Sequence, residues 1–158
     1  MSGEGKPEHR LRLAAMNALA RREHSRAELR EKLVRKHPDL DALCAPVLDR
    51  LEREGLLSDR RFAEAFARSR VRRGQGPLRI LAELRRRGVA DDDAEDALAE
   101  AGVDWTSLAF DELLKRFGEH PPQEARDKSR RMRFLQQRGF PGEAIREALR
   151  RVEGSTVG

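Results

Sequence analysis

Apolar residues recur along the chain three or four residues apart, and sustained alternation between apolar and polar residues is missing. Leu29 and Leu33, for example, lie four residues apart within a polar stretch. Ser25 and Glu28 precede them at the spacing of a capping box, in which each side chain accepts a hydrogen bond from the other residue's backbone N–H. This spacing is typical of helices, so the sequence predicts an all-α fold.

Glycine and proline divide the helical pattern into nine segments, because glycine favours the end of a helix and proline its first turn. Pro77, for example, begins a segment that ends at Gly88. The predicted helices cover residues 11–21, 25–37, 43–54, 58–73, 77–87, 91–101, 104–117, 122–138 and 141–152.

The nine predicted helices fall into three groups of three, which indicates an internal repeat. Residues 27–33 align with residues 82–88, and residues 84–89 align with residues 135–140. Helices rich in leucine and arginine can match by chance over such short runs. The recurrence of helix lengths and glycine stops in all three groups favours a repeat.

We therefore expect three tandem three-helix repeats, over residues 10–57, 58–103 and 104–153. Disordered tails are expected at residues 1–9 and 154–158. Because each repeat in such an array contacts only its neighbours, we expect an elongated, curved molecule.

Composition narrows the class of protein. Charged residues make up 39% of the chain, against about 25% in an average globular protein. The single cysteine, Cys44, excludes an intramolecular disulfide and indicates a reducing compartment. No apolar run approaches the length that spans a membrane. We expect a soluble, cytoplasmic protein without a membrane partner.

Positive and negative charge occupy different segments of the chain. Ten arginines lie between Arg60 and Arg87 with only two acids, and the stretch from Ala90 to Glu112 holds nine acids and no base. Coding bias can explain the preference for arginine over lysine, but it does not explain this crowding. Binding follows the local distribution of charge, so the pattern favours recognition of a polyanion such as a nucleic acid or an acidic nucleoprotein.

Residues for catalysis are not apparent. The four histidines are scattered, without the spacing of a metal or nucleophile motif. The run Gly74-Gln75-Gly76 lacks the lysine and the preceding strand of a phosphate-binding loop. Asp91 to Asp93 lie at a predicted helix start, where the helix dipole already favours negative charge. We expect no enzyme activity, no cofactor and no metal.

The arginines of the basic segment suit a binding surface. At 100° per residue, Arg61, Arg68 and Arg72 fall within about 40° of one another, away from the apolar face of their helix. Arg85 to Arg87 lie at a helix end, where the dipole favours cations. With few base-reading side chains and no aromatic stacking platform, phosphate contact without sequence preference is expected. The candidate contact residues are Arg61, Arg68, Arg70, Arg72, Arg73, Arg79, Arg86, Arg130, Arg131 and Arg133.

Several runs of the chain form a recognisable signature, which is most specific in the middle third. They are Gly55-Leu56-Leu57-Ser58-Asp59-Arg60-Arg61-Phe62-Ala63, Arg68-Ser69-Arg70, Gly74-Gln75-Gly76-Pro77-Leu78-Arg79-Ile80 and Glu83-Leu84-Arg85-Arg86-Arg87-Gly88-Val89, with Ser25-Arg26-Ala27-Glu28-Leu29, Trp105 and residues 128–140 in support. These runs resemble the signature of the bacterial RecX regulators, and the resemblance extends from about Leu13 to Val152.

The resemblance implies three tandem three-helix repeats and a non-enzymatic modulator, usually an inhibitor, of the recombinase RecA. Such a protein lies in the groove of the RecA–DNA filament and interferes with filament extension, ATP hydrolysis and strand exchange, in recombination, DNA repair and the SOS response. We expect a monomer whose partner is the RecA filament, with weak, sequence-nonspecific DNA binding. The alternative is a stand-alone DNA-binding or architectural protein.

Two questions stay open at the level of sequence. The resemblance does not distinguish capping of the filament from groove blocking or disassembly. The acidic segment Asp91–Glu100 either contacts RecA or neutralises a neighbouring basic helix within the chain.

Overall fold

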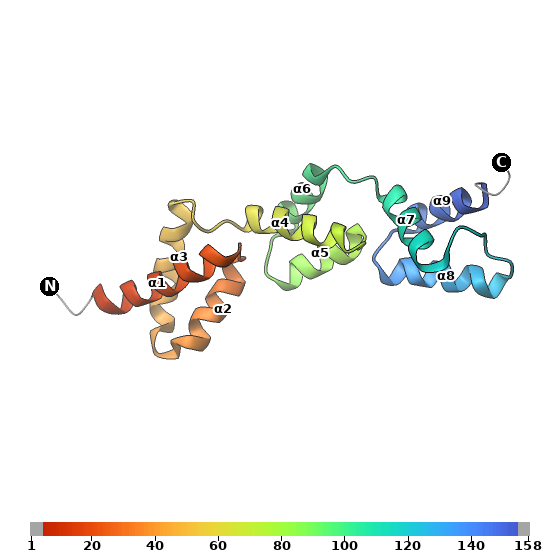
Figure 1. The fold of residues 1–158 in the computed structure, drawn as a ribbon. Coiled ribbons are helices and arrows are strands. Elements are labelled where there is room, and N and C mark those ends of the chain that lie inside the picture. The colour runs from red at the N-terminus through yellow and green to blue at the C-terminus, as the bar shows by residue number, and fades with distance from the viewer. Residues whose placement is uncertain (1–4, 155–158) are drawn as a thin grey trace. The chain divides into compact units, whose positions relative to one another are not determined.

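Helices make up most of the computed structural model, which describes residues 5–154 (Figure 1). Within those residues it contains nine α-helices, one 3-10 helix and no strand, which confirms the predicted all-α class. The elongated, curved shape stays a prediction. The elements are α1 (Gly5–Arg21), α2 (Arg26–Lys36), η1 (Pro38–Leu40), α3 (Asp41–Arg53), α4 (Asp59–Arg72), α5 (Pro77–Arg86), α6 (Asp91–Ala101), α7 (Trp105–Phe117), α8 (Ala125–Gln137) and α9 (Gly142–Gly154).

The start of α1 is the one large departure from the predicted helix ends. The helix begins at Gly5, so the prediction of a disordered tail is wrong for residues 5–9. Pro7 lies in the first turn, where a missing backbone N–H leaves no hydrogen bond unmade, and Glu8 adds favourable negative charge there. The tail prediction is also wrong for residue 154, where α9 ends. The predicted tail residues 1–4 and 155–158 lie outside the described part of the chain.

The described residues form two compact units, and the first contains the residues up to Ala65 together with Leu84–Ala97. Its apolar core lies between α1, α2 and α3. Cys44 is a free, fully buried thiol in this core, and burial raises its pKa. The buried core residues are Leu11, Ala15, Ala18, Leu29, Leu33, Leu40, Cys44, Val47, Leu48, Leu51 and Leu57.

The second unit contains Phe66–Glu83 together with the residues from Leu98 onward. Asp104 caps α7, because its side chain accepts a hydrogen bond from the Ser107 N–H at 3.1 Å. The α7, α8 and α9 helices enclose the core of this unit. Its buried residues are Ala109, Leu113, Leu135, Phe140, Ile145, Ala148, Leu149 and Val152.

Within the second unit, the turn after α4 lies against the turn after α8. The Gly76 N–H donates to the Arg138 carbonyl at 2.7 Å, and the Leu78 N–H donates to the Gly139 carbonyl at 2.9 Å. A Cβ on Gly76 would lie 2.5 Å from the Gly139 carbonyl oxygen, so a larger residue does not fit. Backbone contact therefore holds the turn between α4 and α5 against the turn after α8.

Candidate partner-binding surface

The C-terminal end of α4 and the residue after it present three exposed arginines in the second unit, Arg68, Arg72 and Arg73. Arg68 and Arg72 are four residues apart and therefore lie on the same side of the helix. None of the three forms an ion pair with another residue in the part of the chain that the structure describes. We call Arg68, Arg72 and Arg73 the α4 arginine surface, because their guanidinium groups are available to a partner.

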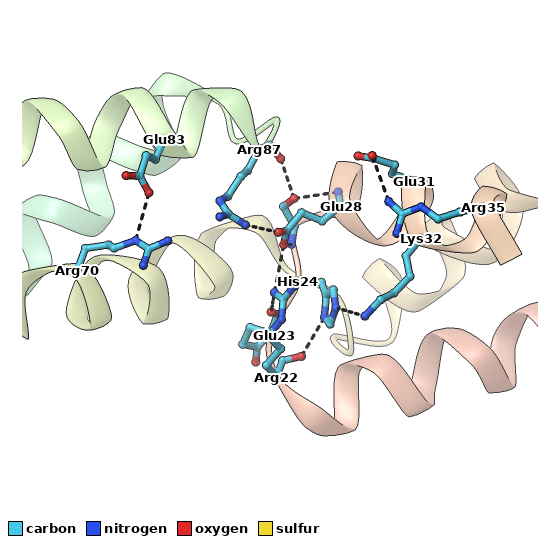
Figure 2. Close-up of polar contacts among 11 residues, drawn as sticks. Arg22, Glu23, His24, Glu28, Glu31, Lys32, Arg35, Arg70, Glu83 and Arg87 are labelled. Carbon is cyan, nitrogen blue, oxygen red and sulfur yellow. Dashed lines mark hydrogen bonds and ion pairs between the residues drawn. The ribbon is translucent and has the colours of Figure 1, made fainter. Parts of the chain in front are cut away.

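Arg70 and Arg79 converge on one carboxylate instead. Arg70 Nε lies 3.2 Å from Glu83 Oε2 (Figure 2), and its guanidinium stands over the Phe66 ring, 4.4 Å from the centroid. Arg79 Nε lies 3.3 Å from the other oxygen of Glu83, and its Nη1 donates to the Gln137 carbonyl at 3.4 Å. The side chains of Arg70 and Glu83 are only 15% and 13% exposed, so this cluster belongs to the fold more than to a contact surface.

Arg61 lies in the first unit and already has a partner. Its Nε is 2.6 Å from Glu23 Oε1, although the Arg61 side chain is 44% exposed. Its charge is therefore balanced within the first unit, and we do not include Arg61 in the α4 arginine surface.

The three arginines at the end of α5 differ from one another. Arg85 Nε lies 3.1 Å from Asp91 Oδ1, and Arg87 Nη1 lies 2.5 Å from Glu28 Oε2. Arg86 is exposed and forms no ion pair with any described residue. Arg85 and Arg87 therefore have partners within the fold, whereas Arg86 remains a candidate contact residue.

The predicted contact residues on α8 also differ in burial and in ion pairing. Arg131 is 1% exposed, donates to the His120 carbonyl at 3.0 Å and pairs with Asp127 at 3.2 Å. Its inclusion as a contact residue is wrong, because a buried, hydrogen-bonded guanidinium cannot reach a partner. Arg130 is exposed but lies 3.3 Å from Asp127. Arg133 is exposed and has no ion pair among the described residues.

The N-terminal end of α2 meets the residue that follows α5 through polar side chains in the first unit (Figure 2). The Ser25 hydroxyl donates to the Arg87 carbonyl at 2.7 Å, and Glu28 accepts from Arg87 and, at 3.3 Å, from Arg22. The predicted capping box of Ser25 and Glu28 is confirmed. We call Arg22, Ser25, Glu28 and Arg87 the charged joint.

The charged joint favours the ionised form of Glu28. Burial alone would raise the pKa of this carboxyl group. Hydrogen bonds from the Ser25 N–H, Arg22 and Arg87, together with the charge of Arg22, outweigh burial and lower the pKa below its ordinary value.

His24 lies beside the joint and is 1% exposed. Its Nδ1 is 3.1 Å from the Arg22 carbonyl oxygen and therefore carries the proton, so that Nε2 accepts from Lys32 Nζ at 3.3 Å (Figure 2). Burial, followed by the positive charge of Arg22, lowers the pKa of His24 below its ordinary value. The neutral imidazole is therefore the form that fits the fold.

The acidic segment Asp91–Glu100 partly neutralises arginines of its own chain. Asp91 pairs with Arg85, and Asp96 Oδ2 lies 3.5 Å from Arg60 Nη1. Asp92 and Glu95 are exposed and have no ion pair with any residue from 5 to 154. Ion pairs within the chain thus account for some of the acidic residues in this segment.

Arg138 was not among the residues predicted from the sequence. Its Nη1 donates to the Arg73 carbonyl at 3.0 Å and lies 3.4 Å from Oε1 of Glu112, a carboxylate that is 6% exposed. Arg138 thereby holds the backbone at the end of the α4 arginine surface. The contact joins residues 65 apart, so no local sequence pattern indicates it.

The described residues contain no group of three or more His, Cys, Asp or Glu side chains that could hold a metal ion. Each helix within residues 5–154 is too short or too polar to cross a membrane.

Comparisons with known proteins identify three domains along the chain. Residues 12–51 match the family model for the first three-helix domain of RecX, residues 58–98 the second and residues 104–149 the third.

Relatives match the same residues over nearly the full chain. The regulatory protein RecX of Halorhodospira halophila is 48% identical over 148 residues, which cover 94% of this chain and 91% of that protein. The regulatory protein RecX of Pseudomonas putida strain GB-1 is 46% identical over 139 residues, 88% of each chain. The crystal structure of RecX from Lactobacillus salivarius has a TM-score of 0.80 at 21% identity, covering 94% of this chain and 98% of that one.

Proposed function

The chain belongs to the RecX family of regulatory proteins, and from that premise we propose that it binds the RecA–DNA filament and modulates RecA. Its effect is mostly inhibitory, on recombinase activity, ATP hydrolysis and strand exchange. The protein acts by binding, without catalysis of its own. Its partner is the filament, and its affinity for free DNA is weak and independent of sequence.

The α4 arginine surface carries this proposal. Arg68, Arg72 and Arg73 are exposed and lack a carboxylate partner in the described structure. Guanidinium groups form bidentate contacts with both carboxylate and phosphate. A RecA–DNA filament offers acidic protein and DNA phosphate together, so the same surface can engage either component. Arg86 and Arg133 extend the set of available cations.

The second candidate function is stand-alone binding of DNA by the same arginines. RecA ATPase activity on single-stranded DNA, measured with and without this protein, separates the two. Inhibition at stoichiometric protein supports the filament as partner. Unchanged ATPase activity at excess protein, with DNA affinity retained in the same buffer, contradicts it and favours the alternative. Affinity for free DNA falls steeply with salt if phosphate contacts dominate.

A further inference from the structure

Three guanidinium groups surround a single aromatic ring at the end of α7. The guanidinium carbons of Arg116, Arg130 and Arg131 lie 5.2, 5.3 and 5.1 Å from the centroid of the Phe117 ring. Phe134 meets the same ring edge-on, with centroids 5.5 Å apart and an interplanar angle of 86°. We call Arg116, Arg130, Arg131 and Phe117 the Phe117 cluster. It lies wholly within the second unit.

Negative charge in the cluster is insufficient to balance these cations. Asp127 is paired with both Arg130 and Arg131, while Arg116 has no carboxylate partner among the described residues. Glu119 and Glu124, in the loop that joins α7 to α8, form no ion pair with any described residue either. Three guanidinium groups against one carboxylate leave a net charge of +2 around the ring.

The cations are close enough to repel one another. Because all three lie near one centroid, any two guanidinium carbons are separated by no more than about 10.5 Å, which is close to the Debye length of about 10 Å at 0.1 M salt. Arg131 is buried and held by the His120 carbonyl, so it cannot move away. Arg116 and Arg130 are exposed, which leaves the cluster open to an anion. Such an anion would relieve the repulsion.

The exposed side of α8 continues the positive charge. Arg126, Arg130 and Arg133 fall within about 60° of one another around the helix and span about 10 Å along it. All three are exposed. Regularly spaced cations along a line suit a linear polyanion. A flexible strand can also bend its phosphates toward the Phe117 cluster, which the phosphates of a rigid duplex cannot do.

We propose that Arg116 and Arg130, the exposed cations of the Phe117 cluster, bind the phosphate backbone of single-stranded DNA together with Arg126 and Arg133, while buried Arg131 adds positive charge behind them. The ring does not stack on bases, since guanidinium groups and Phe134 already surround it. This site requires no RecA, so its test is independent of the proposed filament binding.

The test is fluorescence anisotropy of a labelled oligothymidine with the full chain at several salt concentrations. The variant Arg116→Gln/Arg130→Gln is compared with Arg10→Gln/Arg21→Gln, which removes two exposed, unpaired arginines from α1. Each contact to a single strand contributes about 0.7 to the salt slope, so the cluster variant loses about 1.4 and binds roughly tenfold more weakly. The α1 variant retains the wild-type slope.

A third variant, Arg116→Lys/Arg130→Lys, keeps the positive charge and should retain the salt slope of the wild type. It shows whether weaker binding by the glutamine variant comes from lost charge or from altered side-chain packing. Circular dichroism checks the helix content of all three. The proposal is overturned if the cluster variant binds like wild type, if the α1 variant loses as much, or if the lysine variant binds as weakly as the glutamine variant. Loss of binding to a labelled polyglutamate peptide, with oligothymidine binding unchanged, also overturns it and indicates an acidic protein partner.

Discussion

The charged joint and the α4 arginine surface are both built around arginine, yet they use it differently. At the joint, Arg22 and Arg87 donate to Glu28, a carboxylate that is 15% exposed. On α4, Arg68 and Arg72 meet no carboxylate among the described residues. Both regions are rich in arginine in the sequence. They differ in whether a carboxylate of the same chain pairs with those arginines. Changes at the joint should therefore affect folding, whereas changes on α4 should affect binding.

Removing the shared carboxylate is expected to have the largest effect on stability. Glu28→Ala eliminates half of the capping box and leaves Arg22 and Arg87 without their acceptor, so we expect a loss of about 2–3 kcal/mol in the free energy of unfolding. Urea denaturation measures it. The control is Glu31→Ala, on the same helix, which removes only an exposed pair with Arg35 and should cost less than about 0.5 kcal/mol. Equal losses would contradict a special role for the joint.

Acid should lower the stability of the fold through His24, which lies beside the charged joint. Because the folded state lowers the pKa of His24, the unfolded state binds more protons below the ordinary pKa of 6.5. Stability is fully present above about pH 6.5 and falls at lower pH by up to about 1.4 kcal/mol per unit. Unfolding measured between pH 7.5 and 5.5 checks this.

The variant His24→Gln is the control for the pH dependence. Its amide can donate to the Arg22 carbonyl and accept from Lys32 without titrating. A wild-type profile as flat as that of the variant would exclude His24 as the titrating group.

Substitutions of the neighbouring residues Arg86 and Arg87 should differ in their effect on stability. Arg87→Ala removes a hydrogen-bonded pair with Glu28 and should cost about 1 kcal/mol, whereas Arg86→Ala removes an exposed, unpaired side chain and should stay within about 0.5 kcal/mol. Thermal melting of both variants measures the difference. Indistinguishable melting curves would mean that the pair does not stabilise the fold.

Local features of the fold were accessible from sequence. The Ser25–Glu28 capping box and the helix ends after residue 21 depend on nearby residues, and the structure reproduces them within one turn. The exposure of Arg68 and Arg72 follows from helix periodicity alone.

Contacts between distant residues were not accessible in this way. Arg87 reaches Glu28 across 59 positions, and Arg138 reaches the Arg73 carbonyl across 65. The burial of Arg131 depends on how α8 packs against the chain before it, so its sequence environment looked like that of exposed Arg133.

Neutralising the α4 arginine surface should have the smallest effect on stability. Arg68→Gln/Arg72→Gln breaks no ion pair in the described structure, so we expect a change within about 0.5 kcal/mol. Thermal melting and helix content by circular dichroism check it. A large loss would show that these side chains support the fold, which would remove the distinction between the two regions.

Inhibition of RecA by charge-reversed protein tests the central claim most directly. RecA ATPase activity on single-stranded DNA is titrated with wild type, with Arg68→Glu/Arg72→Glu, and with Arg10→Glu/Arg21→Glu as a matched control on α1. Wild type and control should inhibit at the same concentration. The α4 variant, although folded, should require at least roughly tenfold more protein, since each lost charged contact is worth about 1 kcal/mol or more. Full inhibition by the α4 variant at the wild-type concentration would contradict the assignment of this surface.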